Sequence, residues 1–249
     1  MEKILEVCVD SLESALAAKA GGASRLELCS NLVIGGTTPS LSLLRAAKRE
    51  TELPVHVLLR PRFGDFLYTE REFSLLLEDA AALLENGADA LVCGFLTPDG
   101  ELDGPRMERL VFLAHSAGRK FTLHRAFDVC RDPFSALERC KEWGVDTILT
   151  SGQAPSCLEG GALLEQLFPR AGKVELLLGA GITAAAIREL RQRLPMAHSF
   201  HMSGKRVLSS KMCYRKQGVS MGLPGMSEFE IWQTEENAVR EAWKELDRA

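Results

Sequence analysis

Eight short runs rich in β-forming residues recur along the chain, and helical stretches separate them. Neighbouring runs start roughly 25–30 residues apart, the spacing that a strand followed by a crossover helix requires. The runs are Ile4–Val9, Arg25–Cys29, Val55–Arg60, Ala88–Gly94, Lys120–His124, Asp146–Thr150, Val174–Gly179 and Ala197–Ser203. Eight right-handed crossovers predict a closed (β/α)₈ barrel of the α/β class, the TIM barrel. An open doubly wound sheet is the alternative, but no Gly-x-Gly-x-x-Gly follows the first run.

Helix start signals support this alternation. Thr69-Glu70-Arg71-Glu72 has the pattern of a capping box, and Asp132-Pro133 pairs an N-cap residue with proline at the first helical position. Further N-caps are expected at Asp10 and Thr183.

One segment breaks the rhythm. Residues 204–234 show no clear helical pattern and precede the amphipathic stretch Glu235–Asp247. Loops of this length in compact domains commonly serve binding or assembly. Because no low-complexity tract or linker divides the chain, we expect a single domain over residues 1–249.

The composition excludes several classes of protein. A net charge of −4 argues against a nucleic-acid-binding protein, which normally has a basic excess. No apolar run is long enough to span a membrane, and the N-terminal residues have no signal-peptide pattern, so we expect a cytoplasmic protein. Seven cysteines, an odd number, favour reduced thiols over a disulfide framework.

Strand alternation places ionisable side chains inside the predicted barrel. In the first run Leu5, Val7 and Val9 share the face expected to meet the helices, which turns Glu6 and Cys8 inward. The same alternation turns further polar groups inward: Arg25, Glu27, Cys29, His56, Arg60, Thr122, His124, Ser199, His201 and Ser203. A barrel interior that served only stability would hold Val, Ile and Leu. A network of internal salt bridges is the structural alternative, but a functional site at the strand ends explains the pattern better.

Polar and glycine residues also follow several strands. Arginines occur after the third and fifth runs, and glycine-containing turns follow the seventh and eighth. Such turns let backbone N–H groups approach a phosphate or carboxylate. The predicted anion-binding residues are Arg60, Arg62, Arg125, Gly179, Gly181 and Ser203.

Over essentially its whole length, the chain resembles the copper homeostasis protein CutC family. The stretches that carry the resemblance include Glu6-Val7-Cys8, Arg25-Leu26-Glu27-Leu28-Cys29, Arg60-Pro61-Arg62, His124-Arg125-Ala126-Phe127-Asp128 and His201-Met202-Ser203. The resemblance implies a barrel, a cytoplasmic homo-oligomer such as a dimer or tetramer, and a role in copper homeostasis with Cu(I) as ligand. It also implies that Cys8 and Cys29 are the metal ligands.

Two hypotheses about function stay open at this point. In the first, Cys8 and Cys29 hold Cu(I), a soft ion that suits thiolates, if the strand register brings the thiols together. In the second, the protein is an enzyme that acts on a small anionic metabolite bearing a phosphate or carboxylate. Its candidate catalytic groups are Glu6, Glu27, His124 and His201, where histidine acts near neutral pH and paired carboxylates separate each other's pKa values. A scaffold protein, a third class, would leave the polar interior unexplained.

Overall fold

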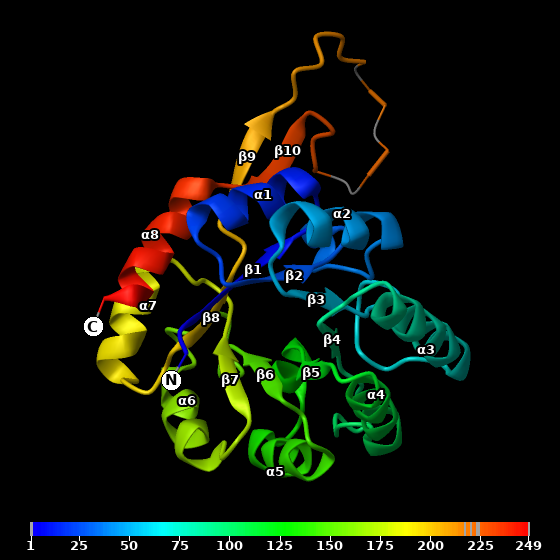
Figure 1. Ribbon diagram of the computed structural model, residues 1–249, viewed down its shortest axis with the longest axis vertical. Coiled ribbons are helices and arrows are strands. Elements are labelled where there is room, and N and C mark those ends of the chain that lie inside the picture. Colours follow the sequence, from blue (N-terminus) through cyan, green and yellow to red (C-terminus); the bar gives the residue numbers. More distant parts are fainter. Residues whose placement is uncertain (1, 217, 220, 223–224, 249) are drawn as a thin grey trace.

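The computed structural model describes residues 2–216, 218–219, 221–222 and 225–248, and it contains a closed barrel of eight parallel strands (Figure 1). The strands are β1 (Ile4–Val9), β2 (Arg25–Leu28), β3 (Val55–Leu58), β4 (Ala90–Cys93), β5 (Lys120–Leu123), β6 (Thr147–Thr150), β7 (Glu175–Leu178) and β8 (Ser199–Met202). They pair in sequence order, and β8 closes the barrel against β1. The predicted TIM barrel is therefore confirmed.

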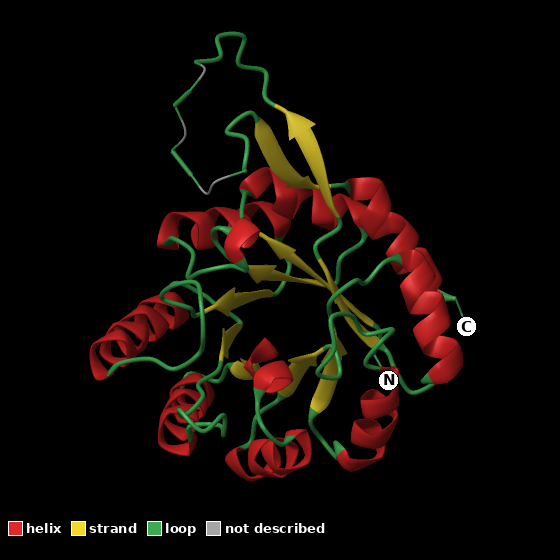
Figure 2. Cartoon of the chain, turned by 180° about the vertical axis from the view of Figure 1, so that it is seen from behind, coloured by secondary structure: helices red, strands yellow, loops and turns green. Residues whose placement is uncertain are grey.

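Helices surround the barrel, as Figure 2 shows. They are α1 (Leu12–Gly21), α2 (Leu41–Thr51), α3 (Glu70–Glu85), α4 (Gly104–Ser116), α5 (Pro133–Trp143), α6 (Gly161–Leu167), α7 (Ala184–Arg193) and α8 (Glu236–Asp247). In the described residues, the connections contain the short 3₁₀ helices η1 (Leu32–Ile34), η2 (Arg125–Val129) and η3 (Phe168–Arg170).

Most of the predicted helix caps are present. Thr69 forms both halves of a capping box at α3, and the side chains of Asp132 and Thr183 cap α5 and α7. The prediction for Asp10 is wrong, because Ser11 adopts the extended backbone of an N-cap and accepts the Ser14 N–H. The Asp10 carboxylate instead accepts a hydrogen bond from the backbone N–H of Leu32 at 3.1 Å.

Six of the eight strands end one or two residues earlier than the sequence pattern predicts, whereas β1 and β6 end where it predicts. Cys29, Arg60 and His124 all lie past the last residue of their strands. The backbone N–H groups of Cys29 and His124 still donate to the neighbouring strand, at 2.9 and 3.1 Å, before the chain turns away. These side chains therefore stand at the carboxyl-terminal rim of the barrel, where enzymes of this fold place their sites.

Residues 204–234 contain structure that the sequence pattern did not predict. β9 (Lys205–Ser209) and β10 (Glu230–Thr234) form an antiparallel pair that projects from the barrel next to α1 (Figure 1). We call residues 205–234 the hairpin arm. Its strands lack a clear apolar alternation because most of their side chains on both faces stay at least partly exposed.

The predicted division between the two faces is confirmed for β1, β2, β3 and β5. Leu5, Val7 and Val9 belong to the apolar core between strands and helices. Glu6, only 1% exposed, lies inside the barrel with Arg25, Glu27 and His56. The folded barrel thus places several ionisable groups within its interior.

Candidate functional site

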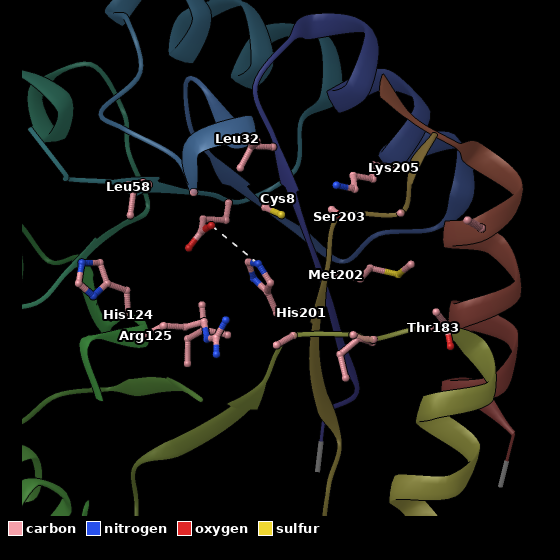
Figure 3. Close-up of a pocket in the computed structure, with 18 of the residues that line it drawn as sticks. Cys8, Leu32, Leu58, His124, Arg125, Thr183, His201, Met202, Ser203 and Lys205 are labelled. Carbon is pink, nitrogen blue, oxygen red and sulfur yellow. Dashed lines mark ion pairs between the residues drawn. The ribbon is translucent and has the colours of Figure 1, made fainter. Parts of the chain in front are cut away.

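A cavity of about 820 Å³ opens at the carboxyl-terminal ends of the barrel strands (Figure 3). Of the residues predicted to form a site, the cavity is lined by Cys8, Glu27, Arg60, His124, Arg125, Gly181, His201 and Ser203. Ala180, also in the lining, has φ 74°, a left-handed backbone that is strained for a residue other than glycine. The volume and mixed lining are typical of a small-molecule site.

Glu6 lies beneath this cavity, where it contacts other buried ionisable side chains of the barrel interior. Its carboxylate accepts a hydrogen bond from Arg25 Nε at 2.5 Å, and Arg25 reaches Glu175 at 2.9 Å on the other side. His56 Nδ1 lies 3.5 Å from the same carboxylate. Burial opposes the charged form, yet Arg25 and then His201 lower the pKa of Glu6 well below its ordinary value. Glu6 is therefore a buried carboxylate that is held in its ionised form.

Glu6 also fixes the orientation of His201. His201 Nδ1 lies 2.7 Å from Glu6 Oε1, and its other ring nitrogen lies 3.9 Å from Glu27 Oε2. The two residues face each other in the register of β1 and β8. Burial alone would lower the pKa of His201, but Cys8 and Glu27 raise it well above the ordinary value. The imidazole thus presents Nε2 to Cys8 and Glu27.

Cys29 and Glu27 form a second buried pair. The Cys29 thiol donates to Glu27 Oε2 at 3.4 Å. Burial, and then the nearby Glu27, raise the pKa of Cys29 well above its ordinary value, so the thiol stays protonated. The pKa of Glu27 is itself raised by burial. Cys29 packs with Cys8 and Leu58 but does not contribute to the cavity lining.

Three potential metal ligands converge in the described part of the chain. One ligand atom each from Cys8, Glu27 and His201 lie within 4.8 Å of one another. The register explains this convergence, because Cys8 pairs with Glu27 across β1 and β2, and Glu6, two residues before Cys8, pairs with His201 across β1 and β8. Figure 3 shows His201 next to Cys8 in the middle of the cavity.

His124 and Arg60 border another part of the cavity. His124 Nδ1 accepts the backbone N–H of Ala126 at 3.2 Å, and the Arg60 guanidinium donates to three backbone carbonyls. Phe66 packs against both side chains. Sequence reasoning missed Phe66, although it follows the arginine motif after β3.

The remaining predicted anion-binding residues differ in position. Arg125 lines the cavity but is bonded to Asp128 and Ser151, at 2.7 and 2.9 Å. Arg62 lies outside the lining and binds Glu72 on the surface at 2.7 Å.

The predicted residues of the turns after β7 and β8 also differ. Gly179 is beneath the lining, where its carbonyl oxygen accepts a hydrogen bond from the Cys157 thiol. Gly181, in the turn after β7, and Ser203, directly after β8, line the cavity.

Asp128 and Glu175 have structural roles that the sequence did not indicate. Asp128 accepts hydrogen bonds from Thr150 and Ser151 as well as Arg125. The position of Asp128 three residues after Arg125 was the available signal for their ion pair. Nothing local to Glu175 indicates its partner Arg25, which is 150 residues away in the sequence.

Comparison with known proteins agrees with the resemblance in the sequence. The model of the CutC family matches residues 3–206. This chain belongs to the CutC family. It is 42% identical to a CutC protein of Parabacteroides distasonis, over 96% of this chain and 99% of that one. It is 41% identical to a mouse protein named a copper homeostasis protein CutC homologue, over 95% of this chain and 87% of the mouse protein.

Solved structures support the same relationship. A CutC structure from Streptococcus agalactiae superposes with a TM-score of 0.75 at 29% identity and covers 81% of this chain and 98% of its own. A thiamine phosphate pyrophosphorylase from Pyrococcus furiosus matches with a TM-score of 0.54 at 14% identity, covering 98% of this chain and 95% of its own. The second similarity concerns the barrel fold alone.

Proposed function

We propose that this CutC-family protein binds Cu(I) in the barrel cavity and acts in cytoplasmic copper homeostasis. The observation that carries the proposal is the hydrogen bond between Glu6 and His201 Nδ1, which leaves Nε2 directed towards Cys8. Metal-binding histidines commonly bond their second nitrogen to a carboxylate in this way. Among the described helices, none combines the length and apolar character needed to cross a membrane.

The donor set fits copper as a bound ion. The Cys8 thiolate and the His201 imidazole are the kinds of ligand that Cu(I) accepts, whereas the Glu27 oxygen suits harder ions. We propose Cys8 and His201 as the main ligands. Cys29, the second cysteine implied by the resemblance, would contribute less, because its buried thiol donates to Glu27.

We propose as a second function that the protein is an enzyme acting on a small anionic metabolite. The spatial arrangement favours this function, because His201 lies between Cys8 on one side and Glu6 on the other. A nucleophile, a base and a group that orients the base occur in this order in many enzymes. Glu27 and His124 line the same cavity. Glu27 would serve as an additional acid–base group, whereas burial lowers the pKa of His124 to about 3, so His124 would act only as a neutral polarising group. Arg60, Arg125, Gly181 and Ser203 would surround the anion, while Arg62 and Gly179 would act only from outside the lining.

We also propose that the protein assembles as a dimer or tetramer through the hairpin arm. Several of the exposed large apolar side chains that the structure describes lie on this arm: Val207, Met212, Tyr214, Val219, Met221, Met226 and Ile231. Exposed apolar surface of this kind is typical of contacts between protein chains. A second copy of the chain is the partner that the family resemblance implies.

The copper proposal predicts which side chains control affinity. Cu(I) would be titrated into reduced protein in competition with a chromophoric Cu(I) chelator. Cys8→Ser and His201→Gln should each weaken binding by tenfold or more, since each removes one of two main ligands. Cys29→Ser should change the affinity severalfold at most.

Cys213→Ser is the matched control, because Cys213 is an exposed thiol on the hairpin arm. It should bind Cu(I) like the parent protein. If Cys8→Ser and His201→Gln also retained the parent affinity while folded, the proposed site would be wrong. Equal weakening by Cys8→Ser and Cys29→Ser would instead support the two-cysteine site.

A further inference from the structure

Arg60 is a buried cation that has no carboxylate partner among the described residues. It is 8% exposed, and its terminal nitrogens donate to the carbonyls of Ile34, Gly36 and Gly64 at 3.3, 3.0 and 2.8 Å. Carbonyl dipoles solvate the guanidinium but do not neutralise it. A buried charge is normally paired with an opposite charge, because desolvation is costly. An anion in the cavity beside Arg60 would supply that pairing.

His124 provides an unused hydrogen-bond donor in the same region. Since its Nδ1 accepts the Ala126 N–H, the ring proton must lie on Nε2. The side chain is 5% exposed, and Nε2 has no hydrogen-bond partner among the described residues. Burial and the charge of Arg60 lower the pKa of His124 to about 3, so the ring stays neutral. A buried donor without an acceptor is destabilising and points to an absent partner.

Phe66 packs against both groups. Its ring centroid lies 4.6 Å from that of His124 and 5.4 Å from Arg60 Cζ. All three side chains line the cavity, and Phe66 is more exposed than the two polar groups. A rotation of one aromatic side chain would therefore uncover the donor and the cation together.

We infer that Arg60 and His124 form a subsite for one oxyanion group, a carboxylate or a phosphate, of a small metabolite, and that Phe66 covers this subsite when it is empty. A neutral Nε2–H group would donate to an oxygen of the anion, and Arg60 would balance its charge. This inference rests on the second proposed function, for which it assigns the groups that would recognise the anionic part of the substrate. Because Cys8, Glu27 and His201 line the same cavity, they would meet the rest of the ligand.

A purely structural role makes a different prediction. Arg60 would then only join the segments that contain Gly36 and Gly64 through its carbonyl contacts. The orphan donor of His124 is not explained by that role, because its Nε2 contributes to none of these contacts. The two roles therefore predict different results. An anion should change the environment of His124 Nε2 if the subsite exists, and it should not if Arg60 is only structural.

The test uses metal-free protein with ¹⁵N-labelled histidine, and oxalate and inorganic phosphate as separate probes. NMR should show an Nε2-protonated, neutral His124 throughout pH 5–8. One of the two probes should shift its Nε2 signal in a saturable way, and the probe that does so identifies a carboxylate or a phosphate ligand. In isothermal titration calorimetry, His124→Gln should bind that probe about tenfold more weakly than the parent protein, as expected for the loss of a hydrogen bond to a charged group.

His115→Gln is the control, since His115 is an exposed histidine on α4, and it should leave probe binding unchanged. Phe66→Ala should strengthen binding severalfold, because no covering ring has to move. If neither probe shifts the Nε2 signal in the folded parent or in Phe66→Ala, the subsite is wrong. Saturable binding without any turnover of candidate substrates would support the subsite and contradict only the enzymatic function.

Discussion

Glu6 is the residue that pairs and orients the other charged side chains of the barrel interior. It bonds Arg25 and His201 and lies close to His56, while being almost fully buried. A neutral side chain at this position would leave the Arg25 guanidinium facing only Glu175, which is itself partly exposed. The same change would remove the acceptor that orients His201.

Glu6→Gln should therefore lower the free energy of unfolding by about 3–5 kcal/mol, the range found when one partner of a buried ion pair is removed. Urea denaturation followed by circular dichroism would measure this loss. Glu78→Gln is the control, because Glu78 is exposed in the middle of α3 and should change stability by less than about 0.5 kcal/mol. Equal stabilities of the two variants would contradict the role given to Glu6.

Two helices at the two ends of the chain, α1 and α8, pack closely at Gly21. A Cβ atom added to Gly21 would lie 2.6 Å from Val239 Cβ and 2.8 Å from the Glu236 carbonyl oxygen. Such distances are too short for carbon contacts, so the helices could keep their separation only with glycine. The glycine thus permits α8 to cover the barrel beside the first helix.

Gly21→Ala should destabilise the protein by about 1–3 kcal/mol through overpacking, despite the better helix propensity of alanine. Chemical denaturation would detect this as a lower midpoint with an unchanged slope. Ala20→Gly, an exposed position in the same helix, should cost about 0.5–1 kcal/mol from propensity alone. A stabilised Gly21→Ala variant would show that the helices can separate without loss.

At the scale of the whole molecule, the hairpin arm stands apart from the closed barrel in Figure 1. Lys205 at its base lies 3.5 Å from the Trp232 ring centroid and also lines the cavity. Most of the exposed apolar side chains named above lie in the connection beyond the two strands of the arm, whereas Val207 and Ile231 lie within the strands. Assembly through the arm and ligand binding in the barrel would therefore involve neighbouring parts of the chain.

Shortening the arm should separate assembly from folding. Ser209 pairs with Glu230, so an Asn-Gly turn can replace residues 210–229 and still join the two strands. Light scattering should then show a single chain in place of a dimer or tetramer, while the far-UV circular dichroism of the barrel is retained. If the shortened protein kept the mass of the parent assembly, the contact surface would lie elsewhere.

Local patterns in the sequence were sufficient to predict the barrel and, for β1, β2, β3 and β5, the face that carries the polar residues. The alternation within Ile4–Val9 places Glu6 and Cys8 inward whatever their partners are, because side chains alternate in any strand. Capping residues such as Thr69 act within a few positions and could be predicted in the same way. The family was also evident from motifs within single strands and turns.

The partners of these inward groups depended on the closed barrel. Glu6 and His201 are 195 residues apart, and only the register between β1 and β8 brings them together. The register between β1 and β2 likewise sets Cys8 opposite Glu27 instead of Cys29. Strand tilt in a barrel determines such pairings, and no local pattern encodes it. The sequence alone therefore determined which residues face the interior, and the tertiary structure decided which of them meet in the cavity.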